Sequence, residues 1–105
     1  MNPSPLSSKN ALITGASSGI GRAIALALAE HGVSTALFAR RKERLEEVAE
    51  QASKTGSRAR IFVVDLSDPA ETGTAVSRAA EEFGGIDILI NAAGVALQAG
   101  LSNGE

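Results

Sequence analysis

Apolar residues along the chain gather in two kinds of segment that alternate. Four short runs are almost continuously apolar: Ala11–Thr14, Thr35–Ala39, Ala59–Val64 and Ile86–Ile90. Such runs are typical of strands that are covered on both faces of a parallel sheet. Segments with helical spacing lie between them. Because strand–helix–strand units join parallel strands through right-handed crossovers, the pattern predicts an α/β fold, a Rossmann-like doubly wound parallel sheet with strand order 3-2-1-4 and three helices.

Each predicted helix carries one apolar stripe and is followed by glycine. The expected buried positions are Ile20, Ala23, Ile24, Ala27 and Leu28 in the first helix, Leu45, Val48, Ala49 and Ala52 in the second, and Val76, Ala79, Ala80 and Phe83 in the third. Gly32 stands where the C′ residue of the first helix belongs, the second helix is expected to end near Gly56, and Gly84 and Gly85 end the third. The third helix has the clearest start, because Asp68 can cap it, Pro69 suits its first turn and Glu71 completes a capping box.

Composition narrows the classes of function. The chain has 105 residues, of which 44% are hydrophobic and 21% charged; this suits one globular domain and is too apolar for a disordered chain. A net charge of −2 does not indicate a nucleic-acid partner or an anionic membrane. The absence of cysteine excludes a disulfide framework and a thiol nucleophile, and a single histidine, His31, cannot form a multi-histidine metal site.

Segments that target a protein to a membrane or out of the cell are not evident. No apolar run approaches the ~20 residues that span a bilayer. The first eight residues are polar, contain two prolines and lack the features of a secretory signal. We therefore expect a flexible N-terminus over residues 1–8, one domain over residues 9–105 and a cytoplasmic location.

A glycine-rich segment, Thr14–Gly21, joins the first predicted strand to the first predicted helix. That position places free backbone N–H groups and the positive end of the helix dipole at the carboxyl edge of the sheet, which suits a pyrophosphate group. Gly15 permits a tight turn and Gly19 lets the backbone approach a phosphate. Gly21 lets the helix pack closely on the sheet.

Ser17 and Ser18 add hydroxyl donors to this turn. An alternative interpretation is a simple turn in which Ser18 caps the following helix. The place of the segment within repeated strand–helix–strand units favours the anion site. A P-loop is excluded, because no Gly-Lys-Ser/Thr sequence follows.

Three motifs together resemble those of the short-chain dehydrogenase/reductase family. Thr14–Gly21 resembles the T-G-x-x-x-G-x-G cofactor motif of that family, and Asn91–Gly94, with the sequence Asn-Ala-Ala-Gly, resembles a second motif that follows the fourth strand. Asp65, directly after the third strand, resembles a third. The motifs occur in family order and cover essentially the whole chain. The resemblance implies that the glycine-rich turn, Ile20 included, binds a dinucleotide cofactor.

The same resemblance implies further cofactor contacts. The side chain of Asp65 and the backbone of Leu66 would hold the adenine ring; alternatively, Asp65 forms an Asx turn toward Ser67. Asn91 would tie the fourth strand to its neighbours, or else serve only as a turn former. The backbone from Ala92 to Gly94 would line the ribose and nicotinamide side.

The end of the second predicted strand bears on the choice of nucleotide. In dinucleotide folds an acidic residue there binds the ribose hydroxyls of NAD, whereas an arginine receives the 2′-phosphate of NADP. Ala39 stands where the acid is expected and Arg40 follows it, so we expect Arg40 to bind the phosphate of NADP or NADPH. Arg41 is left open. Lys42 and Arg44 are expected on the solvated face of the second helix, paired with its glutamates.

The family resemblance implies hydride transfer between nicotinamide and a carbonyl or alcohol substrate, with the tyrosine of a Y-x-x-x-K motif as the acid–base group. This chain contains no tyrosine. We therefore assign no catalytic residue and expect an NADP-binding half-domain, truncated after strand four and inactive alone. Two alternatives stay open: a non-catalytic dinucleotide-binding or interaction module, and a truncated half-fold. An apolar strand at an open sheet edge recruits other chains, so we also expect self-association or a homo-oligomer.

Overall fold

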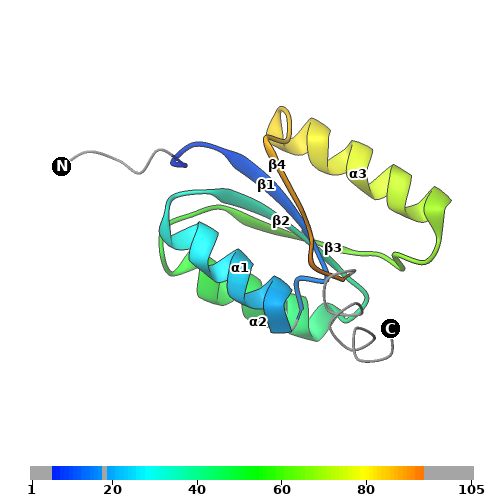
Figure 1. The fold of residues 1–105 in the computed structure, drawn as a ribbon, viewed down its shortest axis with the longest axis horizontal. Helices are drawn as coiled ribbons and strands as arrows, with labels where there is room; N and C mark the ends of the chain where they lie inside the picture. Colours follow the sequence, from blue (N-terminus) through cyan, green and yellow to red (C-terminus); the bar gives the residue numbers. More distant parts are fainter. Residues whose placement is uncertain (1–5, 18, 94–105) are drawn as a thin grey trace, which may run out of the picture.

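The computed structural model describes residues 6–17 and 19–93, and within them strands and helices alternate as predicted (Figure 1). The elements in chain order are β1 (Asn10–Thr14), α1 (Gly19–Glu30), β2 (Ser34–Ala39), α2 (Lys42–Ser53), β3 (Ala59–Val63), α3 (Pro69–Phe83) and β4 (Ile88–Asn91). All strand pairs are parallel and their order is β3-β2-β1-β4. The predicted fold class and strand order are therefore confirmed.

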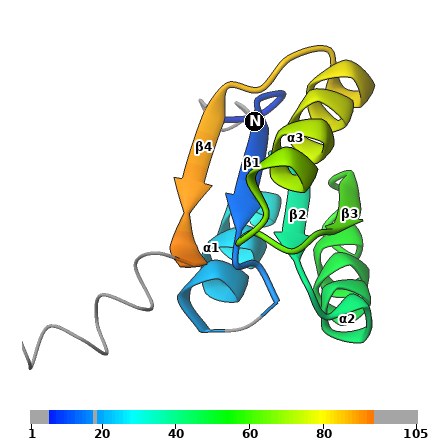
Figure 2. The same cartoon turned by 90° about the vertical axis from the view of Figure 1, so that its right-hand side faces the viewer.

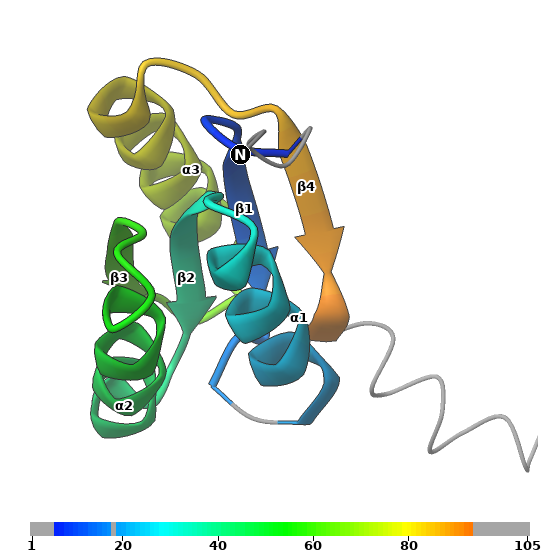
Figure 3. The same ribbon diagram turned by 90° about the vertical axis from the view of Figure 1, so that its left-hand side faces the viewer.

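The helices cover the sheet from both sides. Helices α1 and α2 lie on one face and α3 on the other, with β4 at one edge (Figures 2 and 3). Successive strand residues alternate between the two layers, as the side-chain alternation of a strand requires. Leu12, Phe38 and Phe62 pack beneath α3, whereas Ile13 and Leu37 pack beneath α1 and α2.

Helix α1 buries a different face from the one that the sequence predicted. Its buried residues are Gly21, Ala25 and Ala29, one on each turn, while Ile20 is exposed. The reason is steric: a Cβ on Gly21 would collide with the carbonyl oxygen of Gly15. Gly21 therefore faces this turn, and Ala25 and Ala29 follow it on the same face of the helix at intervals of four residues. The larger Ile24 and Leu28 are only half-buried.

The other two helices follow the prediction more closely. In α2 the predicted Leu45, Val48 and Ala52 are buried. In α3 the buried face is turned by about one residue from the predicted one: Ala75 takes the place of Val76, while Ala79 and Phe83 are buried as predicted. All of these buried residues recur at the spacing of helix turns.

The start of α3 has the predicted cap but only half of the predicted capping box. Asp68 Oδ1 accepts a hydrogen bond from Glu71 N (3.1 Å), and Pro69 occupies the first turn. The Glu71 carboxylate, however, accepts from Asp65 N (3.2 Å). Asp68 N donates instead to the Asp65 carbonyl (3.0 Å). Helix α3 ends at Gly84, whose φ of 74° is the left-handed conformation of a glycine C-cap.

A cluster of hydrogen bonds around Asn10 holds β4 against β1. Asn10 Nδ2 donates to the carbonyls of Phe83 and Gly85, each at 2.9 Å. Asn10 N donates to Asp87 Oδ2 (2.8 Å), and Asp87 N donates back to the Asn10 carbonyl (2.8 Å). These bonds precede the pairing of Ala11 with Ile88. They explain why β4 begins at Ile88, two residues later than predicted.

At the other end of the chain, the structure describes only residues 6–8 of the eight for which we predicted a flexible terminus. These residues form a turn in which Lys9 N donates to the Leu6 carbonyl (3.0 Å) and Ser8 N to the Gly32 carbonyl (3.4 Å). Among the described residues, no helix is long and apolar enough to cross a bilayer.

Gly73 is a place where the fold can be stabilised. It lies on the exposed side of α3, and a Cβ there would have no heavy atom within 4 Å. Alanine in an exposed helix interior is favoured over glycine by about 0.8–1.0 kcal/mol, so Gly73→Ala should raise the free energy of unfolding in urea by about this amount. The matched change Gly84→Ala should lower it by about 1–2 kcal/mol, because φ at Gly84 is 74°. A destabilised Gly73→Ala variant would contradict the packing described for α3.

Candidate functional site

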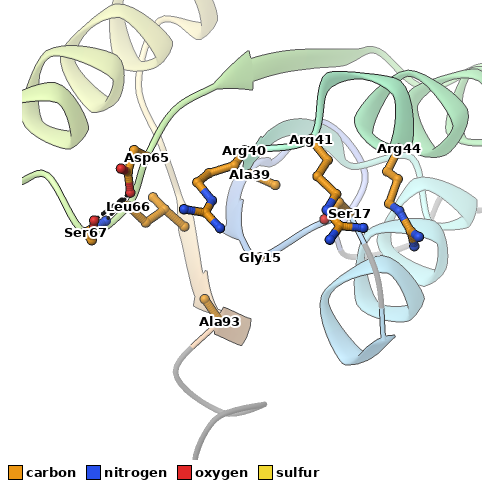
Figure 4. Close-up of a pocket in the computed structure, with 10 residues that line it drawn as sticks. All are labelled: Gly15, Ser17, Ala39, Arg40, Arg41, Arg44, Asp65, Leu66, Ser67 and Ala93. Atoms are coloured by element: carbon orange, nitrogen blue, oxygen red, sulfur yellow. Dashed lines mark hydrogen bonds between the residues drawn. The ribbon is translucent and has the colours of Figure 1, made fainter.

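A pocket of about 560 Å³ opens at the carboxyl edge of the sheet (Figure 4). Four separate connections contribute to it, which is the expected place for a ligand crevice in an open parallel α/β sheet. The residues that line the pocket are Gly15, Ser17, Ala39, Arg40, Arg41, Arg44, Asp65, Leu66, Ser67 and Ala93. The topology therefore gathers at one site residues that are separated by up to 78 positions in the chain.

The turn from β1 to α1 is packed tightly against the end of β4. Gly15 has a φ of 67°, and a Cβ there would lie 2.7 Å from Ala93 N. A Cβ on Gly21 would meet the Gly15 carbonyl oxygen and lie 3.1 Å from the Ala92 side chain. Packing alone therefore requires glycine at both positions.

Gly19 differs from these two glycines. It also has a positive φ, 58°, but a Cβ built there would have nothing within 4 Å. The backbone at the start of α1 is therefore open to an approaching group, and the first turn of α1 contains no acidic residue. Ile20 lies beside it and is exposed. Ser17 lines the pocket, whereas Ser18, a predicted hydroxyl donor, lies outside the described residues.

The end of β4 is joined to the end of β1 through side chains. Thr14 Oγ1 donates to Asn91 Oδ1 (2.9 Å), and these two residues are register partners in the sheet. Ala92 is buried behind the glycine turn, so the pocket wall is made by Ala93. Gly94, which we also expected at the site, lies outside the described residues.

Three arginines form one wall of the pocket. Arg40 follows β2, Arg41 has the extended φ and ψ (−93° and 101°) of a residue that precedes a helix, and Arg44 lies in the first turn of α2. We expected Arg44 to pair with glutamates of its own helix, but in the part of the chain that the structure describes the ion pair is Arg60–Glu82. Arg44 lines the pocket instead, four residues after Arg40. Arg40 precedes the N-cap residue Arg41 and is not part of α2, so no helical periodicity in the sequence links it to Arg44.

The opposite wall is the turn that follows β3. Asp65 Oδ1 accepts from Ser67 Oγ (2.6 Å) and from Ser67 N (3.0 Å), so an Asx turn is present. Asp65, Leu66 and Ser67 nevertheless all line the pocket. The Asx turn and a binding role are thus compatible, and Ser67, which we named only as part of the turn, is a further pocket residue.

Asp65 stays ionised near neutral pH. The two hydrogen bonds from Ser67 lower the pKa of its carboxyl below the ordinary value, and the positive charge of Arg40 across the pocket contributes to the same direction. Arg40 extends from the end of β2 toward the Asp65 turn (Figure 4). Its guanidinium therefore lies where it can meet an anion that enters between the two walls.

Hydrogen-bonding groups of the Asp65 turn remain available to a ligand. Both bonds from Ser67 reach Oδ1, so Asp65 Oδ2 has no hydrogen-bond partner among the described residues. The Leu66 N–H likewise donates to no group within the described part of the chain. The same part of the chain contains no cluster of three or more His, Cys, Asp or Glu residues that could hold a metal ion. The site thus offers backbone donors, guanidinium groups and one carboxylate oxygen.

Known proteins resemble this chain in both sequence and fold. The short chain dehydrogenase family model matches residues 9–104. The chain is 46% identical over 91 residues to glycine betaine reductase ATRR of Emericella nidulans, and the aligned segment covers 87% of this chain and 7% of the relative. It is 47% identical over 88 residues to L-rhamnose 1-dehydrogenase (NADP(+)) of Thermoplasma acidophilum, or 83% of this chain and 35% of the relative.

Solved structures agree with these sequence matches. NAD⁺-bound xylitol dehydrogenase superposes with a TM-score of 0.79 at 35% identity, over 81% of this chain and 33% of that one. An alcohol dehydrogenase from the archaeon Thermococcus sibiricus, complexed with 5-hydroxy-NADP, superposes with a TM-score of 0.74 at 39% identity, over 77% of this chain and 35% of that one. The chain thus spans about a third or less of the length of these relatives. Because the family model matches nearly the whole chain, this protein belongs to the short-chain dehydrogenase family.

Proposed function

We propose that residues 9–105 are the NADP(H)-binding half-domain of an oxidoreductase that transfers hydride between nicotinamide and a carbonyl or alcohol substrate. The observation that carries the choice of NADP is the arginine wall of the pocket, formed by Arg40, Arg41 and Arg44 beside the apolar Ala39. A carboxylate at the Ala39 position would repel a 2′-phosphate, whereas guanidinium groups bind phosphate oxygens in a forked geometry. The similarity to L-rhamnose 1-dehydrogenase (NADP(+)) supports the same cofactor.

The remaining pocket residues fit the other parts of such a cofactor. The open backbone at Gly19, the acid-free first turn of α1 and the Ser17 hydroxyl suit a diphosphate. Asp65 Oδ2 and Leu66 N–H suit the edge of adenine, because its 6-amino group donates and its N1 accepts. We assign the ribose and nicotinamide side to Ile20 and to the segment that contains Asn91, Ala92 and Gly94, on the family resemblance.

The chain's own residues therefore bind and orient the cofactor. NADPH, when bound, supplies the hydride. A sequence without tyrosine cannot itself supply the phenol of a Y-x-x-x-K motif, so we assign proton transfer and substrate recognition to a part of the enzyme outside this sequence. We place the protein in the cytoplasm, where a reduced nicotinamide pool is available.

Removal of the Arg40 side chain tests the choice of cofactor. A charge-assisted hydrogen bond to the 2′-phosphate contributes about 1.5–3 kcal/mol, so Arg40→Ala should reduce the preference for NADPH over NADH by about tenfold to a hundredfold. Fluorescence titration of both nucleotides measures the ratio of their dissociation constants. Lys42→Ala is the matched control, because Lys42 is exposed and does not line the pocket. An unchanged ratio in Arg40→Ala would show that the phosphate assignment is wrong.

Turnover distinguishes cofactor binding from complete catalysis. With NADPH and a panel of carbonyl compounds, we expect the 105-residue chain to oxidise NADPH no faster than its Gly19→Arg variant. That substitution fills the open space at Gly19 and should abolish binding. Turnover above this control, followed as loss of NADPH absorbance, would refute the assignment of proton transfer to a tyrosine outside the sequence.

Self-association of this chain is a further expectation, located at β4. Within the described residues β4 pairs only with β1, and Leu89 is 69% exposed beside an apolar groove of about 530 Å³ that also includes Leu12, Leu66 and Val76. Sedimentation velocity at tens of micromolar should show dimers or larger species, and Leu89→Lys should shift them toward monomer. Val63→Lys, on the opposite edge strand, should have no such effect. A compact wild-type monomer would count against the proposal.

A further inference from the structure

The turn between β3 and α3 is held from both of its ends. On the strand side, Val64 N donates to the Ala39 carbonyl (3.0 Å), which extends the pairing of β3 with β2 by one residue. On the helix side, Thr72 Oγ1 donates to the Asp68 carbonyl (2.8 Å). The segment between these anchors contains Asp65 and Leu66, the two residues that offer hydrogen-bonding groups to the pocket. Its conformation therefore decides where those groups point.

Glu71 supplies a hydrogen bond from the helix to this turn, in addition to the longer bond that Thr72 Oγ1 donates to the Asp65 carbonyl (3.5 Å). In a complete capping box its carboxylate would return to the backbone N–H of the cap residue Asp68. That N–H donates to the Asp65 carbonyl (3.0 Å), so the carboxylate reaches six residues back to Asp65 N (3.2 Å). The bond restrains the peptide plane between Val64 and Asp65, and with it the direction of the Asp65 side chain.

Glu71 does not face the 560 Å³ pocket. It lines a smaller cavity of about 240 Å³ together with Val63, Val64 and two residues that also line the main pocket, Arg40 and Asp65. A ligand in the main pocket would therefore meet Asp65 and Leu66 without touching Glu71. Any influence of Glu71 on binding is therefore indirect, and the hydrogen bond that it makes is to Asp65 N.

We infer that Glu71 is a positioning residue for base recognition: its hydrogen bond to Asp65 N holds the Asp65 carboxylate and the Leu66 N–H in the arrangement that matches adenine. This inference rests on the proposed function, because it takes the ligand to be an adenine dinucleotide. Ser67 restrains the same carboxylate from the other side by occupying Oδ1, which leaves Oδ2 for the base. The role of Glu71 requires an acceptor atom and not a negative charge.

The test compares NADPH with its hypoxanthine analogue, in which the 6-amino group is replaced by a carbonyl and N1 carries a proton. In the analogue the carbonyl oxygen would face Asp65 Oδ2, so that two acceptors meet, and the N1–H would face the Leu66 N–H, so that two donors meet. The wild-type chain should therefore bind NADPH about tenfold more tightly than the analogue, or better. Dissociation constants for the two nucleotides are measured on the same preparation by fluorescence. Because an unfolded fraction weakens both apparent affinities equally, their ratio reports base recognition and not stability.

Three variants give distinct expectations. Glu71→Ala removes the acceptor, and the preference for NADPH should fall to about threefold or less. Glu71→Gln keeps a carbonyl oxygen at the same place and should retain at least half of the wild-type ratio. Glu81→Ala, an exposed glutamate of the same helix that does not line the pocket, should leave the ratio unchanged.

The outcomes separate this inference from the proposed function. A wild-type preference that persists in Glu71→Ala overturns the positioning role alone and leaves cofactor binding intact. A ratio that falls equally in Glu71→Ala and Glu71→Gln also overturns it, because charge and not the acceptor would then be responsible. Failure of the wild-type chain to bind NADPH, or to prefer it over the analogue, overturns the adenine assignment and this inference with it.

Discussion

The close approach of the β1–α1 turn to the end of β4 is the constraint on which the rest of the structure depends. Gly15 lies against Ala93 N, and Gly21 lies against the carbonyl of Gly15, with no room for a Cβ at either position. These contacts bring the first turn of α1 down onto the carboxyl edge of the sheet. They also turn Gly21 inward, and Ala25 and Ala29 are buried on the same face of α1 because they follow Gly21 at intervals of four residues.

The same constraint arranges the chemistry of the pocket. With the start of α1 at the switch point between β1 and β4, the loops after β2 and β3 face it across the crevice. One loop contributes guanidinium groups and the other a carboxylate whose pKa is lowered chiefly by Ser67. Positive charge and the hydrogen-bonding turn are therefore held on separate elements. A ligand with an anionic part and a base would meet complementary groups at both ends.

The fold was largely predictable because its signals are local. Continuous apolar runs indicate buried parallel strands, and β2 begins within one residue of its predicted start. The cap at Asp68 was predictable for the same reason, since its partner Glu71 N is three residues away. The failures involve contacts between distant parts of the chain. Which face of α1 is buried depends on the close contact between Gly21 and the carbonyl oxygen of Gly15. The apolar pattern of Ile20 and its neighbours contains no information about that contact.

The same distinction between local signals and distant contacts applies to the candidate site. By itself, the sequence determined the elements, their parallel order, the glycine-rich turn and the arginine after β2, because each depends on residue type and spacing over a few positions. Only the tertiary structure decided that Arg44 lines the pocket and that the Glu71 carboxylate reaches Asp65 N. The physical reason is that a long side chain has several partners within reach. The packing of neighbouring elements, and not its own position in the chain, decides which of them it meets.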